Sequence, residues 1–137
     1  MAPFVYEQRV RWRDVDLAGI VHFAHFITYL EVAEHEWVRR HGYEYGEFLE
    51  TMGICMPRVS VHCDYHAPAR LDDLLSIEVR LERVGNTSFT LKFDVYRGSG
   101  EEYVAQGRFV IATVSRTSFK PVRVPDELRD MLDALKE

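Results

Sequence analysis

Hydrophobic and polar residues along this chain follow different spacings, and each spacing predicts a different kind of element. Residues 4–12 alternate between apolar and polar side chains, which predicts a half-buried strand. From about residue 24 to residue 40 the apolar positions recur at helical spacing, as on one face of a helix. These apolar positions are Phe26, Tyr29, Leu30, Ala33 and Trp37. A second, short helix is expected from about Tyr45 to Met52, ended by Gly53.

Beyond Gly53 the apolar residues again occur at every second position, which predicts four further strands. These strands cover about residues 59–66, 77–82, 89–95 and 103–114. Gly85 and Asn86 predict a turn, and a short helix is expected from about Pro125. Strands joined by short turns form an antiparallel sheet. One long helix covers only one face of a five-stranded sheet, so we expect an α+β fold whose sheet curls around that helix. The other face or an edge then needs a partner, and a homo-oligomer is expected.

The length of 137 residues is that of one domain, taken as residues 1–137. The apolar share of 47% is normal for a soluble globular protein, and no apolar run approaches the roughly 20 residues of a membrane span. The N-terminal residues lack the basic and apolar regions of a signal peptide, so a cytoplasmic location is expected. Cys55 and Cys63, if both lie on one extended segment, are about 26 Å apart and are expected as free thiols.

The net charge of −5 argues against a nucleic-acid-binding protein. The charges are unevenly spread, because no acidic residue occurs between Tyr103 and Pro125. The basic residues of this stretch are Arg108, Arg116, Lys120 and Arg123. Such a basic strip suits a small polyanion, and the alternative is a solvated strand edge protected by cations.

The most informative run is residues 12–23, Trp-Arg-Asp-Val-Asp-Leu-Ala-Gly-Ile-Val-His-Phe. Two alternate carboxylates, Asp14 and Asp16, are followed by Gly19 and then by the long helical pattern. This layout puts an acid beside the positive end of a helix, where a polarised carbonyl could be held. If the segment is extended, the carboxylates point the same way and raise each other's proton affinity. The alternative is that they cap the turn and the helix, which is our interpretation of Asp14.

This run resembles the pattern of the 4-hydroxybenzoyl-CoA thioesterase family of hotdog-fold proteins, which is Asp-x-Asp-x-x-Gly-x-Val, an aromatic-rich turn and a helix. The resemblance extends over nearly the whole chain in length and element order, although only this run is specific. It implies a hotdog fold and hydrolysis of an acyl-CoA or acyl-carrier-protein thioester to a free acid and the thiol. It also implies no cofactor and an active site at the interface of a homodimer or homotetramer.

By the resemblance, Asp16 is the catalytic carboxylate and the N–H of Phe23 is the candidate oxyanion donor. Aspartate can attack the thioester carbonyl directly, giving an anhydride-like intermediate, or act as a general base on water. Gly19 would let the backbone turn sharply and approach the substrate closely. The residues expected to contact the substrate are Gly19, His22, Phe26, Tyr29, Val59 and Val61.

Coenzyme A carries a 3′-phosphate and a pyrophosphate, which a basic rim would hold, since arginine makes paired hydrogen bonds with phosphate. The turn at residues 86–89 also resembles the family's turn near which the pantetheine arm runs. The residues expected to bind CoA are Arg83, Asn86, Ser88, Arg116, Lys120 and Arg123, with Arg58 and Arg70 as further candidates.

His22 and His25 lie three residues apart near Asp16, as in some metal sites and acid–base pairs. The spacing alone is a weak signal, and we interpret them as loop histidines with no metal, His22 standing where the family often has Tyr or Trp. Glu31 and Glu34 lie on the predicted long helix, where another branch of hotdog thioesterases carries its catalytic glutamate. Because the loop aspartate is present here, both glutamates are interpreted as solvated or capping residues.

Two other functions use the same fold. A hotdog dehydratase or hydratase carries an Asp–His or Glu–His pair in a motif that has no match in this sequence. A non-catalytic thioester-binding or assembly protein could share the scaffold, because fold does not determine function. The intact Asp16 argues against that second possibility.

Overall fold

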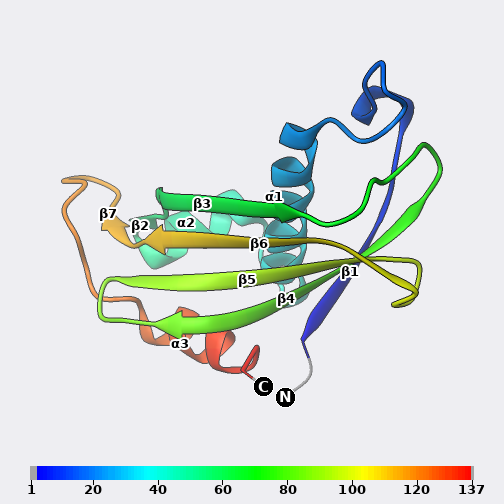
Figure 1. Ribbon diagram of the computed structural model, residues 1–137. Helices are drawn as coiled ribbons and strands as arrows, with labels where there is room; N and C mark the ends of the chain where they lie inside the picture. The colour runs from blue at the N-terminus through cyan, green and yellow to red at the C-terminus, as the bar shows by residue number, and fades with distance from the viewer. Residues whose placement is uncertain (1–2, 137) are drawn as a thin grey trace.

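A computed structural model describes residues 3–136, in which a long helix lies against one face of a curved sheet (Figure 1). The five strands of this sheet pair antiparallel in the order β1-β4-β5-β6-β3. The elements in chain order are β1 (Phe4–Arg9), the 3-10 turn η1 (Trp12–Asp14), α1 (Phe23–Arg40), α2 (Tyr45–Met52), β2 (Ile54–Cys55), β3 (Arg58–Tyr65), β4 (Leu74–Val84), β5 (Ser88–Arg97), β6 (Glu102–Ala112), β7 (Val114–Ser115) and α3 (Asp126–Asp133). The expected α+β hotdog architecture is confirmed.

The apolar face of α1 forms the centre of the core. Leu30 and Ala33 are fully buried on this face, and Trp37 is nearly so. The sheet contributes alternate side chains from its central strands to the same cluster, including Phe93 and Phe109, whose rings lie 4.9 Å apart. Each large apolar side chain buried in this way stabilises the fold by about 1.5–3 kcal/mol. The apolar side chains that the helical and strand spacings predicted therefore pack together in one core.

The side chain of Leu30 on α1 packs against Gly107 on β6. A Cβ added to Gly107 would collide with Cδ1 of Leu30. Glycine thus leaves room on the sheet for the Leu30 side chain, which a larger residue at position 107 would displace.

Two boundaries differ from those expected. The first strand ends at Arg9 and not near residue 12, because the chain turns at η1, where the Asp14 N–H donates to the carbonyl of Arg11 at 3.0 Å. The last long strand ends at Ala112, and Val114–Ser115 pairs instead with Ile54–Cys55 in a small two-stranded sheet. Strands of two residues have no periodicity, so the sequence pattern could not reveal them.

Glu34 of α1 is fully buried, so its interpretation as a solvated or capping residue was wrong. Its carboxylate accepts a hydrogen bond from the Tyr45 hydroxyl at 2.9 Å and forms an ion pair with Arg58. Burial raises the pKa of Glu34, and Arg58 opposes that rise. Arg58 therefore joins the start of β3 to the central helix and is engaged inside the protein, in contrast to its suggested role as a CoA ligand.

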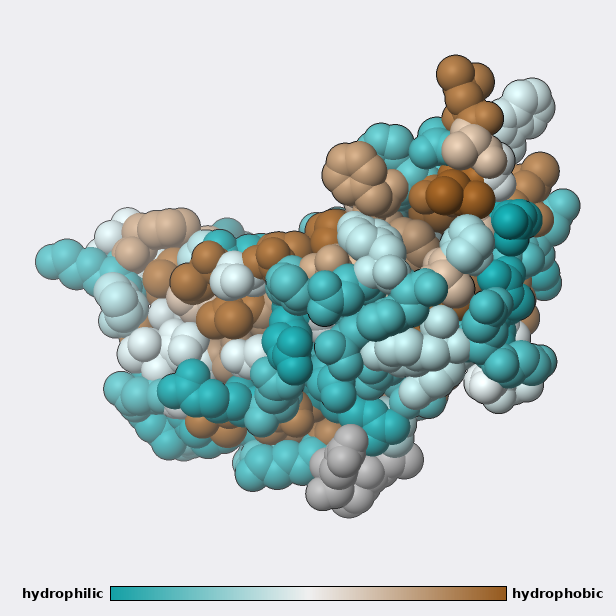
Figure 2. Space-filling view, viewed as in Figure 1, coloured by the Kyte–Doolittle hydropathy of each residue, from teal (hydrophilic) through white to brown (hydrophobic). Residues whose placement is uncertain are grey.

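Strand β3 is an edge strand that pairs with β6 on one side, while most of its side chains are exposed. Val59 is 66% exposed and Val61 is 43% exposed, so β3 presents apolar surface beside an open backbone edge. Figure 2 shows hydrophobic side chains along the upper border of this face, over β3 and the start of α1. The outer face of the sheet carries paired charges, such as Arg108 and Glu82 at 2.9 Å. Arg108 therefore behaves as a sheet-surface cation.

No helix within residues 3–136 is long and apolar enough to cross a membrane. Cys55 and Cys63 are both free thiols, as expected.

Replacing Gly107 with Leu should lower the free energy of unfolding by about 1–3 kcal/mol, because the added side chain overpacks the contact with Leu30. Urea denaturation monitored by circular dichroism measures the change. Gly46→Ala is the matched control: Gly46 lies in α2 with open space around its Cα, so this substitution should leave stability unchanged or raise it slightly. Equal stability of Gly107→Leu and the native protein would contradict the close approach.

Candidate active site

A tight turn after η1 presents Asp16 at the surface. The Asp16 N–H donates to the carbonyl of Ile20 at 3.0 Å, and the Gly19 N–H donates to the carbonyl of Asp16 at 2.9 Å. Gly19 has a φ of +81°, a left-handed conformation that glycine adopts without steric cost. A bridge between Val15 and Val21 closes the turn. The sharp turn expected at Gly19 is thus present.

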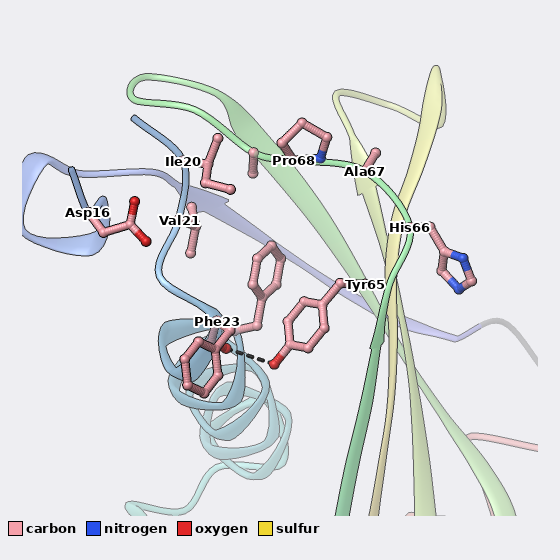
Figure 3. Close-up of a pocket in the computed structure, with 10 residues that line it drawn as sticks. Asp16, Ile20, Val21, Phe23, Tyr65, His66, Ala67 and Pro68 are labelled. Atoms are coloured by element: carbon pink, nitrogen blue, oxygen red, sulfur yellow. Dashed lines mark hydrogen bonds between the residues drawn. The ribbon is translucent and has the colours of Figure 1, made fainter. Parts of the chain in front are cut away.

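The carboxylate of Asp16 is exposed and only partly engaged. Its Oδ1 accepts a hydrogen bond from the Ala18 N–H at 2.8 Å, and no described residue donates to its Oδ2. Figure 3 shows this carboxylate near Val21 at one side of a pocket. One oxygen is therefore held in place while the other stays accessible to a substrate or to water.

Asp14 lies in a different environment from Asp16, in agreement with its interpretation as a capping residue. Asp14 is buried, and its Oδ2 accepts hydrogen bonds from the Tyr29 hydroxyl at 2.7 Å and the Arg11 N–H at 2.9 Å. His25 lies 3.4 Å from its Oδ1. Burial and then the neighbouring Asp14 raise the pKa of Tyr29 well above its usual range. Asp14 caps its own turn, as interpreted, and also attaches that turn to α1.

The first turn of α1 begins at Phe23, directly after the capping residue His22. Nδ1 of His22 accepts a hydrogen bond from the Ala24 N–H at 3.2 Å, and its ring stacks on Phe23 with centroids 4.5 Å apart. The N–H of Phe23 has no acceptor among residues 3–136. Free N–H groups at a helix start carry partial positive charge, so this end of α1 favours a developing negative charge.

A pocket of about 410 Å³ opens between the turn that carries Asp16 and the segment that follows β3 (Figure 3). Its walls are mostly apolar. The lining residues are Asp16, Ile20, Val21, Phe23, Phe26, Tyr65, His66, Ala67, Pro68 and Ala69. The Tyr65 hydroxyl crosses between the two walls and donates to the carbonyl of Phe23 at 2.8 Å.

The pocket brings together some of the substrate-contact residues expected from the sequence. Phe23 and Phe26 line it beside Asp16, whereas the Tyr29 hydroxyl is bound to Asp14 in the core. Val59 and Val61 lie farther along β3, outside the lining of this pocket in a single chain.

Sequence reasoning missed the wall formed by residues 65–69. The segment His-Ala-Pro-Ala after an edge strand carries a loop signal but no catalytic motif, so only the fold reveals its place.

The six residues first expected to bind CoA lie away from this pocket, whereas the further candidate Arg70 pairs with Ile20 at its wall. Arg83, Asn86 and Ser88 lie at or beside the turn between β4 and β5, and Arg116 and Lys120 follow β7. Figure 1 shows β7 and this turn at the opposite end of the sheet from the start of α1. The residues are already partly engaged: the Asn86 carbonyl accepts from the Val124 N–H at 2.8 Å and the Ser88 carbonyl from the Gly85 N–H at 2.7 Å.

Arg123 forms an ion pair with Asp126 at 2.5 Å, which lowers the pKa of that carboxyl. By contrast, Arg116, Lys120 and Arg83 have no ion-pair partner within the described part of the chain.

The histidines near Asp16 are occupied by local contacts. Within residues 3–136, no three His, Cys, Asp or Glu side chains form a group that could hold a metal ion. His22 caps the helix and His25 contacts Asp14.

Comparison with known proteins agrees with the fold and the pocket described above. The sequence profile described as the thioesterase-like superfamily matches residues 10–132. The chain belongs to the thioesterase-like superfamily. This confirms the resemblance to hotdog thioesterases, and the chain is a thioester hydrolase.

Individual relatives of this superfamily match over almost the full chain. A 1,4-dihydroxy-2-naphthoyl-CoA hydrolase from Synechococcus is 30% identical, with 97% of this chain and 92% of that protein covered. Acyl-CoA thioesterase YbgC from Haemophilus influenzae is 26% identical, with 97% and 96% covered. The crystal structure of a 1,4-dihydroxy-2-naphthoyl-CoA thioesterase from Synechocystis has a TM-score of 0.88 at 20% identity, with 96% of each chain covered, and shows the shared fold.

Asp14→Ala should lower the free energy of unfolding by about 1–3 kcal/mol, because the buried Tyr29 hydroxyl loses its acceptor. Asp16→Asn should change that free energy by no more than about 0.5 kcal/mol, because Asp16 is exposed and Asn keeps an oxygen for the Ala18 N–H. Parallel urea denaturation of the two variants measures the difference. Equal losses of stability would show that the two carboxylates do not have the separate environments described.

Proposed function

We propose that this thioesterase hydrolyses acyl-CoA in the pocket at the start of α1, with Asp16 as its catalytic carboxylate. One observation carries the proposal: an exposed carboxylate with one accessible oxygen lines the same pocket as Phe23, the first residue of the helix, whose N–H lacks an acceptor among the described residues. A thioester carbonyl in this pocket would meet a nucleophile or base from one element and an oxyanion donor from another.

Either role of Asp16 gives a balanced reaction. As nucleophile, a carboxylate oxygen attacks the carbonyl carbon, the C–S bond breaks, CoA leaves as thiolate, and water then hydrolyses the mixed anhydride. As general base, Asp16 takes a proton from water as the water oxygen attacks the same carbon, the C–S bond breaks, and the proton passes from Asp16 to the departing CoA thiolate. In both routes the Phe23 N–H stabilises the negative oxygen, an interaction worth about 3 kcal/mol in other enzymes.

The pocket walls support an apolar acyl group. Ile20, Val21, Phe26 and Pro68 line the cavity, and the Phe26 ring meets the Tyr65 ring edge to face at a centroid distance of 5.4 Å. Aryl and medium-chain aliphatic groups both suit such walls. The aryl-CoA named for the Synechococcus relative favours an aryl group first, and a carrier-protein thioester would place the same acyl group in the same cavity.

The functional unit that we propose is a homo-oligomer in which two copies pair along β3, as a dimer or within a tetramer. The open backbone edge of β3 and its exposed Val59 and Val61 support this pairing. In an antiparallel β3–β3 pair, the start of one strand meets the end of the other. Val59 and Val61 would then lie in the interface that closes the substrate pocket.

The same pairing gives the basic residues a role. In one chain, the Arg116 N–H donates to the carbonyl of Gly53 at 3.3 Å, so the segment after β7 lies near the start of β3. Antiparallel pairing would carry Arg116 and Lys120 of the partner subunit toward the end of β3, beside the pocket. CoA phosphates could then be held by Arg116, Lys120 and Arg123, with Arg83, Asn86 and Ser88 along the pantetheine arm. The free thiols support a cytoplasmic location.

Asp16→Asn should lower kcat by at least about 100-fold toward benzoyl-CoA and octanoyl-CoA, because Asn is neither a base nor a comparable nucleophile. Thiol release in the presence of a chromogenic disulfide measures turnover. Asp130→Asn, at an exposed position on α3, is the matched control and should keep native activity. Full activity of Asp16→Asn would move the catalytic role to another residue.

Replacing Arg116, Lys120 and Arg123 together with Ala should raise KM for benzoyl-CoA by about 10-fold, with little effect on a benzoyl-pantetheine thioester. The reason is that only CoA carries the nucleotide phosphates that these cations would bind. Steady-state kinetics on both substrates separate the two effects. Arg39→Ala with Lys136→Ala is the control for a general loss of positive charge. Equal rises in KM on both substrates would argue against phosphate binding.

A further inference from the structure

Two side chains, one at each end of strand β3, connect this strand to α1. At its start, Arg58 forms an ion pair with the buried Glu34. At its end, the Tyr65 hydroxyl donates to the carbonyl of Phe23, a residue 42 positions away in the sequence. Most side chains of β3 between these points are exposed, so the two contacts set how the edge strand lies against the helix.

The contact made by Tyr65 spans the pocket. Tyr65 and the residues after it form one wall, and Phe23 with the turn at Asp16 forms the other. Figure 3 shows the Tyr65 hydroxyl reaching Phe23 at the top of the helix. The ring of Tyr65 also packs on Phe26. This bond therefore sets the separation of the two walls between which a thioester has to fit.

The hydrogen bond from Tyr65 matters for the proposed catalysis because its acceptor is Phe23. The Phe23 carbonyl belongs to the first turn of α1, and the N–H of the same residue is the proposed oxyanion donor. Holding the carbonyl restricts rotation of this first turn. A misplacement of about 1 Å in a reacting group can cost up to about 100-fold in rate.

We infer that Tyr65 is a positioning residue for thioester hydrolysis, which holds the first turn of α1 at the distance from the opposite wall that the reacting carbonyl requires. This inference rests on the proposed function.

The chemistry of the phenol agrees with positioning and not with proton transfer. Burial, together with the nearby Cys63, raises the pKa of Tyr65 to about 12. The hydroxyl therefore stays protonated across the neutral range and donates its proton to the Phe23 carbonyl throughout. Its removal should change rate without removing a titration from the pH profile.

The test is Tyr65→Phe, which keeps the ring against Phe26 and removes only the hydroxyl. With benzoyl-CoA and octanoyl-CoA, kcat should fall about 10-fold, while KM stays within about twofold and the melting temperature is unchanged. The limbs of the kcat pH profile should keep their midpoints. Tyr103→Phe is the matched control, because it removes a hydroxyl that donates to Asp94 at 2.5 Å and should leave kcat native.

Four outcomes decide the inference. A selective fall in kcat for Tyr65→Phe supports it, and a native kcat in that variant overturns it. Loss of one limb of the pH profile would overturn it in favour of an acid–base role. If the folded wild-type protein releases no thiol from either substrate, the proposed function fails, and the role of Tyr65 fails with it. That outcome differs from one in which the wild type is active and Tyr65→Phe is equally active, which overturns the role of Tyr65 alone.

Discussion

A carboxylate loses its hydration on burial, which is unfavourable unless hydrogen bonds replace the water. Asp14 satisfies this condition through the Tyr29 hydroxyl at 2.7 Å and the Arg11 N–H at 2.9 Å. Its backbone carbonyl also accepts from the His22 N–H at 2.8 Å, so one residue attaches the N-terminal loop both to the side and to the start of α1. Asp16 follows two positions later and is presented next to that helix start. The position of Asp16 thus depends on the buried Asp14.

The edge strand β3 completes the site from the other side. It begins at an internal ion pair, Arg58 with Glu34, and ends at the Tyr65 bond to the first turn of α1. Its backbone edge between these points is open, which is normally a liability for aggregation. Pairing with a second copy would cover this edge and bring the segment after β7 toward the pocket. The proposed oligomer and the proposed catalysis therefore share one structural element.

The helical periodicity of residues 24–40 and the glycine after Met52 predicted α1 and α2 closely, and Gly53 does adopt a left-handed φ of +69°. The element order was enough to derive a sheet around one helix. The same patterns did not reveal the small sheet of β2 and β7, since pairs of two residues carry no period. They also treated Glu34 as a surface residue, because a polar residue on a helix is ordinarily solvated.

The sequence by itself determined the fold class, the turn at Gly19 and the run that carries Asp16, because these depend on local spacing and on backbone preferences. Only the tertiary structure decided what each carboxylate faces. Asp14 and Asp16 have the same chemistry and neighbouring positions, yet one is buried against Tyr29 and the other lines the pocket. The wall at Tyr65 likewise arises from contact between segments far apart in the chain. Burial and long-range hydrogen bonds are properties of packing, and local pattern does not encode them.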